Sequence, residues 1–229
     1  MPSNDVRSQG CRALEGLWDF FDRGDYVNRV ALEVGKTSTF AIALEWPGWC
    51  RRGKHPDEAL EALDGARERY QRVVRGTGPQ GAIRVVGTVE GDTTTDFGAP
   101  SIIGPWDDVA LSKTQRRRFV ELLDDCWDYF DRATNFAPNL LRKGPRGGGR
   151  DRQAMVDHVR EAERAYARRL GQPVAPRTPW EEQRVSVRAG LWTPSPEAKW
   201  PISYAARRIA WHVLDHAWEM EDRGNGPTP

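Results

Sequence analysis

Cysteine is scarce in this chain of 229 residues, which contains three cysteines and no CxxC pair. The three stand far apart in the sequence, at Cys11, Cys50 and Cys126. A disulfide framework needs an even set of cysteines and a zinc ribbon needs closely spaced pairs, so the sequence argues against both. Such sparse use of cysteine is typical of a reducing compartment, and we expect the protein to be cytoplasmic.

The chain also lacks an excess of charge of either sign and any long apolar run. Its 34 basic and 33 acidic side chains leave a formal net charge of +1, so no overall field attracts nucleic acid or a membrane surface. No stretch approaches the roughly 18 apolar residues that cross a bilayer. Residues 1–16 have no apolar core flanked by positive charge, which a signal peptide would need. We therefore expect neither a nucleic-acid partner nor a membrane partner.

The amino-terminal part of the chain has the pattern of a small α+β module. Residues 1–25 are interpreted as an arm or short helix, because their apolar positions have helical spacing over only a short length. A helix is predicted at 55–74, with Pro56 in its first turn. Three segments alternate apolar and polar residues as half-covered strands do: 26–34, 38–46 and 82–91. Residues 26–105, including a turn-rich connector from 92, are thus predicted to form a small antiparallel sheet with one helix.

The carboxy-terminal part, residues 106–229, has the pattern of an all-α four-helix bundle. Ser112 is a plausible cap for the first helix, and Pro138 ends that run. Glycine and proline separate the four predicted helices, which are 112–136, 151–170, 179–191 and 203–222. Four consecutive helices with no intervening strand favour a bundle.

Three of the four histidines could meet inside such a bundle. His212 and His216 stand four apart on the last predicted helix, so their side chains project from one face. His158 lies on the second predicted helix, within an inward-facing apolar stripe. Three protein ligands with one open position are typical of a catalytic metal site. The alternative is that these histidines are hydrogen-bonded core residues without a metal.

The order and helix placement of these histidines resemble the DinB/YfiT-like metal-binding four-helix bundles. Members of that family carry one histidine on the second helix, as in MVDHVREAE around His158, and an HxxxH on the last, as in His212–His216. The resemblance covers about half of the chain. It implies a divalent site of the zinc or nickel type. For some relatives it also implies transferase or isomerase chemistry that uses a low-molecular-weight thiol as cosubstrate and acts on a small molecule.

Two glutamates follow the histidines at helical spacing. Glu219 is three residues beyond His216, and Glu161 is three residues beyond His158. Either carboxylate could orient an imidazole, bind the metal directly or act as a general base. The alternative for both is a solvated carboxylate that pairs with an arginine, and for Glu161 we favour that alternative.

The amino-terminal module resembles HicB-like domains. The resemblance rests on a strand with a Pro-Gly turn, ALEWPG at 43–48, followed by a helix that starts with DEAL at 57–60. It implies a small sheet with one covering helix, of a kind used in toxin-neutralising or ligand-sensing proteins. The DNA-binding segment that antitoxins often carry after this module is absent, because the bundle occupies that place.

Two functions of different classes follow from the sequence. The first is a metal-dependent transferase or isomerase with a thiol cosubstrate. The second is a non-catalytic interaction or sensing protein, in which the metal is structural and the HicB-like module binds a partner. The absence of an obvious fourth protein ligand favours the first. The sequence leaves open the substrate, the native metal and whether the chain forms a homodimer.

Overall fold

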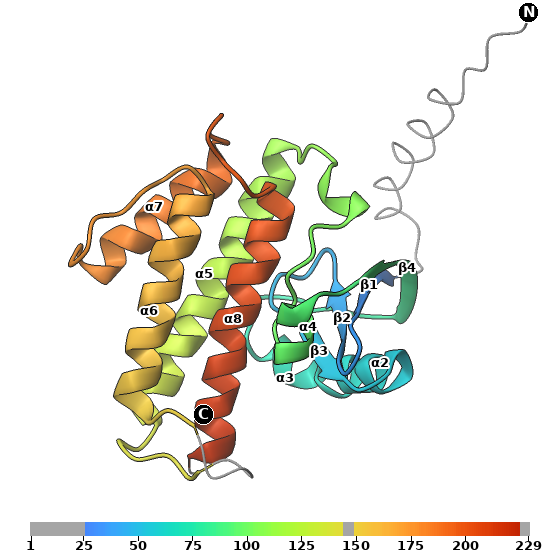
Figure 1. Ribbon diagram of the computed structural model, residues 1–229, viewed down its shortest axis with the longest axis horizontal. Coiled ribbons are helices and arrows are strands. Elements are labelled where there is room, and N and C mark those ends of the chain that lie inside the picture. Colours follow the sequence, from blue (N-terminus) through green and yellow to red (C-terminus); the bar gives the residue numbers. More distant parts are fainter. Residues whose placement is uncertain (1–25, 144–148, 225–229) are drawn as a thin grey trace, which may run out of the picture.

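The computed structural model describes residues 26–143 and 149–224 (Figure 1). The arm or short helix expected within residues 1–25 lies outside the described residues. The described chain consists of an amino-terminal sheet with its helices, followed by a four-helix bundle. Among these residues, no helix is long and apolar enough to cross a membrane.

The sheet has four strands in the order β3-β2-β1-β4. The strands are β1 (Val27–Val34), β2 (Thr39–Ala43), β3 (Cys50–Gly53) and β4 (Ala82–Glu90). β2 is antiparallel to both β1 and β3, but β4 is parallel to β1. The prediction of an antiparallel sheet was therefore wrong in one pairing, and the sheet is mixed. The reason is that helices intervene between β3 and β4 and return the chain to the end of the sheet where β1 begins.

Short elements of the module were not predicted. β3 was missed because its four residues, CRRG, are too few and too polar to show an alternating pattern. The predicted helix 55–74 is two helices, α2 (Pro56–Gly65) and α3 (Arg67–Gln71), which join at Ala66. The connector contains a short helix, α4 (Thr93–Phe97), whose first turn is capped by the side chain of Asp92.

The bundle agrees closely with its prediction. Its helices are α5 (Lys113–Phe136), α6 (Arg152–Arg169), α7 (Trp180–Trp192) and α8 (Ile202–Arg223). The hydroxyl of Ser112 accepts a hydrogen bond from the backbone N–H of Gln115 at 3.2 Å, which confirms the predicted cap of α5. α5 packs against α7 and α8, and α6 packs against the same two helices. These four contacts close the bundle.

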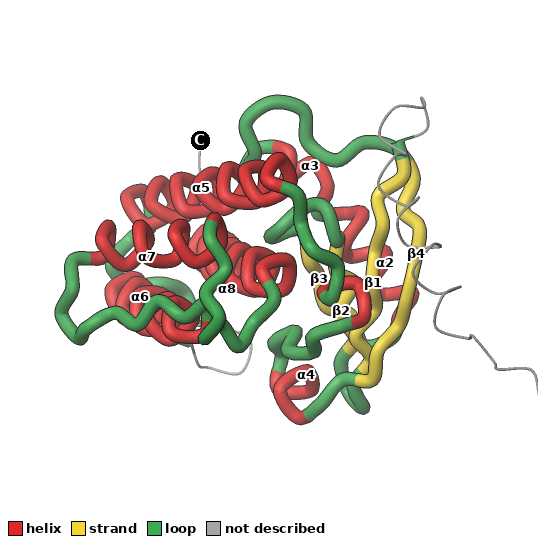
Figure 2. The backbone as a smooth tube through the Cα atoms, turned by 90° about the horizontal axis from the view of Figure 1, so that it is seen from above, coloured by secondary structure: helices red, strands yellow, loops and turns green. Residues whose placement is uncertain are grey.

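Helix α8 joins the two parts of the chain. It lies on the side of the bundle that faces the sheet (Figure 2), and its Trp211 ring meets Phe40 of β2 edge-on, with centroids 5.9 Å apart. Arg69 of α3 donates a hydrogen bond to Glu221 at 2.6 Å. One continuous hydrophobic cluster contains residues of both parts, from Leu32 in β1 to Leu214 in α8. The sheet and the bundle therefore share a core, and the predicted boundary near residue 105 remains a prediction.

Candidate metal centre

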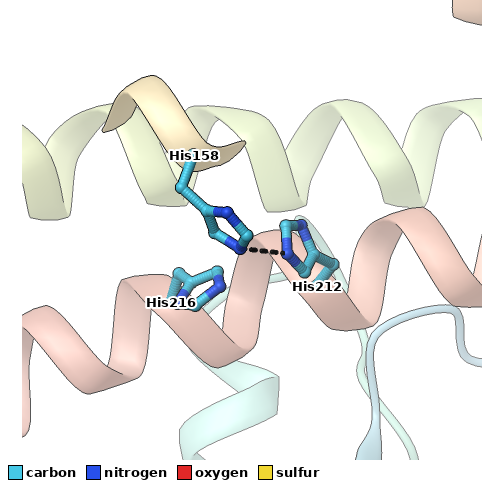
Figure 3. A group of neighbouring side chains, drawn as sticks. All are labelled: His158, His212 and His216. Atoms are coloured by element: carbon cyan, nitrogen blue, oxygen red, sulfur yellow. Dashed lines mark hydrogen bonds between the residues drawn. The ribbon is translucent and has the colours of Figure 1, made fainter. Parts of the chain in front are cut away.

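Three histidines from two helices converge inside the bundle (Figure 3). His212 and His216 stand one turn apart on α8, and His158 reaches them from α6. One ring nitrogen from each residue lies within 4.8 Å of the other two. The Nε2 atoms of His158 and His212 are 3.1 Å apart. The structure thus brings together the three histidines predicted from the sequence, of which helical spacing suggested His212 and His216 and the expected bundle suggested His158.

Buried apolar residues on both helices hold this geometry. On α6, Met155 and Val159 are buried beside His158, and this apolar stripe turns the imidazole toward the interior. On α8, Ile209 and Val213 are fully buried next to the histidine pair. These buried residues lie where α6 packs on α8, and they fix which face of each helix meets the other. The position of His158 next to the α8 histidines therefore follows from packing.

Burial keeps two of the imidazoles in their neutral form. His212 is 6% exposed, and burial lowers its pKa well below the usual value, with His216 and Arg208 adding to the effect. Partial burial lowers the pKa of His158 to about 4, and the charge of His216 contributes. A neutral imidazole keeps a lone pair on one ring nitrogen, which is the form that binds a metal.

Glu219 contacts the Nδ1 atom of His216. Its Oε2 lies 3.1 Å from Nδ1 of His216, while its Oε1 accepts a hydrogen bond from Arg223 at 2.5 Å. The hydrogen bond from His216 is the main cause that lowers the pKa of Glu219. A carboxylate on Nδ1 fixes the ring and its tautomer and directs Nε2 toward the other histidines. Glu219 therefore has the contact expected of an orienting residue.

Glu161 does not take part in the cluster. Its side chain is 63% exposed, and its Oε2 accepts a hydrogen bond from Arg164 at 2.6 Å. The structure shows the solvated pairing with arginine that was favoured for Glu161, and the alternative roles as a ligand or a base have no contact that supports them. Cys126 is equally remote from chemistry, because complete burial raises the pKa of its thiol well above the usual value.

Two neighbours of the cluster were not singled out as site residues from the sequence. Tyr166 of α6 meets His212 edge-on, with ring centroids 5.7 Å apart. Arg208 lies one turn before His212 on α8 and places its guanidinium over the Tyr166 ring, with Cζ 5.6 Å from the centroid. The available signal was the four-residue spacing of Arg208, His212 and His216, which puts all three on one helical face.

Nδ1 of His212 is buried and has no hydrogen-bond partner among the described residues. A metal-bound histidine usually donates its second ring N–H to a carboxylate, a carbonyl or water. The imidazoles are thus supported unequally, because Nδ1 of His216 has a carboxylate partner and Nδ1 of His212 has no acceptor in the described part of the chain. The site is a set of three nitrogen donors with one orienting acid.

No protein-family model, no curated protein and no solved structure matches this chain. The likenesses to DinB/YfiT-like bundles and to HicB-like domains therefore rest on the residues quoted for them.

Proposed function

We propose that this protein binds one divalent metal ion, zinc or nickel, through His158, His212 and His216. The observation that carries the proposal is the approach of three ring nitrogens to within 4.8 Å of one another in the bundle interior. Imidazole nitrogen is a preferred ligand of both metals. Two ligands of a tetrahedral zinc ion with bonds of about 2.0–2.1 Å stand roughly 3.3 Å apart, close to the 3.1 Å between the Nε2 atoms of His158 and His212.

The chemistry of the donor set supports an ion more than a bare hydrogen-bonded pair. A hydrogen bond between His158 and His212 satisfies one donor and one acceptor, and it gives the nearby ring of His216 no role. His216 nevertheless has its outer nitrogen fixed by Glu219. A carboxylate that fixes a histidine tautomer is the usual support of a metal ligand. A metal ion between the three rings would be bound by one nitrogen of each.

We further propose that the metal site serves a transferase or isomerase that uses a low-molecular-weight thiol. This step rests on the DinB/YfiT-like arrangement of the histidines. Three protein ligands leave a position for an exogenous ligand, and a bound metal favours the thiolate form of a thiol, which is the nucleophile. Among the chain's own residues, Glu219 holds His216 in place, and Tyr166 packs against His212. We propose that the reacting thiol comes from the cosubstrate, since the two cysteines among the described residues, Cys50 and Cys126, are both buried.

A structural metal is the second candidate function. The observation that favours it is burial: His212 and His216 are 6% and 9% exposed. An ion held there would tie α6 to α8, and α8 also packs against the sheet. In that case the HicB-like module would be the part of the protein that binds a partner.

Metal content tests the proposed site. The purified chain is loaded with Zn²⁺ or Ni²⁺, freed of excess metal and analysed by mass spectrometry for metal per chain. We expect about one ion per chain in the wild type, and a loss of most of it in His158→Ala and His212→Ala. His55→Ala is the matched control, since His55 is exposed and outside the cluster. Equal metal content in all four proteins would refute the site.

Exchange at the open position separates the two functions. The Co²⁺-loaded protein is titrated with 2-mercaptoethanol, and the visible absorption of the ion is followed. A thiolate band is expected if a position is open to small molecules. An unchanged spectrum, with metal still bound, would favour the structural role.

A further inference from the structure

Arg208 of α8 lies beside the three histidines. Among the described residues, no carboxylate forms an ion pair with it, and its buried Nη1 has no hydrogen-bond partner. Its neighbour Arg207 pairs with Asp107, and Arg223 pairs with Glu219. A buried guanidinium N–H with no acceptor is costly, so the position calls for an acceptor that the described chain does not supply.

Aromatic rings hold the Arg208 side chain in place. Its Cζ lies 4.6 Å from the Trp211 ring centroid and 5.6 Å from the Tyr166 ring centroid. Packing against rings uses the face of a guanidinium and leaves its N–H edge free. That edge has the fork geometry that binds a carboxylate or another oxyanion through two hydrogen bonds.

The held guanidinium and the histidine cluster are adjacent. Tyr166 contacts both Arg208 and His212, with its ring 5.7 Å from that of His212. Arg208 and His212 stand four positions apart on α8, which corresponds to about 6 Å of axial rise. That separation is short enough for one small molecule to span.

A bound divalent ion would also add positive charge beside Arg208. Neutral imidazoles balance none of the ion's two charges, and the carboxylate that contacts the cluster, Glu219, is shared between His216 and Arg223. An anionic ligand would balance part of the remaining positive charge.

We propose that Arg208 is an anion-binding subsite of the metal centre, and that it receives the carboxylate of a small molecule whose other end binds at the open metal position. The inference rests on the proposed function and makes it more specific, because it assigns a carboxylate to the substrate or cosubstrate. Tyr166 and Trp211 are the positioning residues that hold the guanidinium.

Two thiols that differ at one end test the subsite. Co²⁺-loaded protein is titrated with 3-mercaptopropionate and with its neutral analogue 3-mercaptopropanol, and the thiolate band gives each Kd. We expect the carboxylate to bind at least about tenfold more tightly in the wild type. Arg208→Met should bring the two Kd values to within about twofold, while Arg208→Lys should keep part of the preference because it retains the charge.

Controls distinguish failure of the subsite from failure of the metal site. Arg168→Met, at an exposed position on α6, should keep the wild-type preference, and Arg208→Met should keep the wild-type metal content and melting temperature. If metal content is normal and Arg208→Met still prefers the carboxylate as strongly as the wild type, the subsite is refuted and the metal site stands.

If the wild type binds no metal, the proposed function fails and the subsite is tested in metal-free protein. The side-chain ¹⁵N–¹H signal of Arg208 is assigned by its loss in Arg208→Met and followed during titration with each thiol. A shift with 3-mercaptopropionate and none with 3-mercaptopropanol supports the subsite. No shift with either overturns it.

Discussion

The Nε2 atoms of His158 and His212 lie 3.1 Å apart, although 54 positions of sequence separate the two residues. At that distance two protonated imidazoles would repel each other strongly, and burial already disfavours the charged form of both rings. The pair can share one proton or one metal ion. His216 approaches the same point, with its ring centroid 5.0 Å from that of His158. The three rings together favour the ion.

Metal binding should stabilise the fold, because the ion would connect α6 to α8. An ion that binds the folded state alone adds about 2.7 kcal/mol when its free concentration is a hundred times its Kd. We expect Zn²⁺ to raise the Tm of the wild type and a chelator to reverse the change. In His212→Ala the Tm should not respond to Zn²⁺. A wild type whose Tm ignores Zn²⁺ over the same range would contradict the prediction.

The two glutamates predicted from the sequence should behave differently on substitution. Glu219→Gln weakens the acceptor that orients His216, and loss of such support typically reduces metal affinity about 10- to 100-fold. Glu161→Gln is the matched control, since Glu161 has the same spacing from its histidine but is exposed and bound to Arg164. Competition with a metal-sensitive dye measures both affinities. Equal losses, or none in Glu219→Gln, would remove the orienting role.

A buried acid on the far side of α6 should make stability depend on pH. Glu163 accepts hydrogen bonds from the indoles of Trp127 and Trp180, and burial raises its pKa to about 7. In the unfolded chain the Glu163 carboxyl ionises near its usual pKa of 4.5, so between pH 4.5 and 7 a rising pH stabilises the unfolded state more than the folded state. The free energy of unfolding is therefore highest below about pH 4.5. It falls as the pH rises to about 7, with a slope of up to about 1.4 kcal/mol per pH unit.

Glu163→Gln tests this linkage, because an amide does not titrate. Urea unfolding of the wild type and the variant at pH 5, 6, 7 and 8 gives the two free energies of unfolding. We expect the difference between them to change between pH 5 and 7 and to stay constant above. Tryptophan fluorescence of the folded protein should titrate near pH 7 in the wild type alone. A pH-independent difference would mean that Glu163 stays ionised throughout.

Local signals account for the parts of the fold that the sequence predicted well. Ser112 and the proline and glycine residues between helices locate the ends of α5 to α8 within one or two residues. His212 and His216 share a face by helix geometry alone. The approach of His158 to this pair could be predicted only by assuming a bundle, and the family resemblance supplied that assumption. In the structure the approach results from the packing of α6 on α8.

The parts that were missed depend on tertiary contacts. The parallel pairing of β4 with β1 results from the path of the chain through α2 and α3, which no strand pattern encodes. Glu161 and Glu219 have the same helical spacing, and although an arginine partner was favoured for Glu161, the structure was needed to show that Arg164 is that partner and that Glu219 reaches His216. Arg208 shares a helical face with His212 and His216 in the sequence, but its role depends on its contacts with Trp211 and Tyr166 and on the lack of an acidic partner among the described residues.

The junction between the sheet and the bundle predicts one sharply localised effect. Gly48 has a φ of +97°, and a Cβ on it would lie 2.7 Å from Cδ1 of Leu214 and 3.2 Å from Sγ of Cys126. Alanine there must adopt a left-handed backbone and also displace core atoms of α5 and α8. We expect Gly48→Ala to lower the free energy of unfolding by on the order of 2–4 kcal/mol.

Gly65→Ala is the matched control, since nothing lies within 4 Å of a Cβ at Gly65. At the end of α2 it should be neutral or stabilise by up to about 1 kcal/mol. Urea unfolding compares the two variants. Equal effects would mean that the Pro47–Gly48 turn is not packed against the bundle in solution, and the shared core would have to be divided into two.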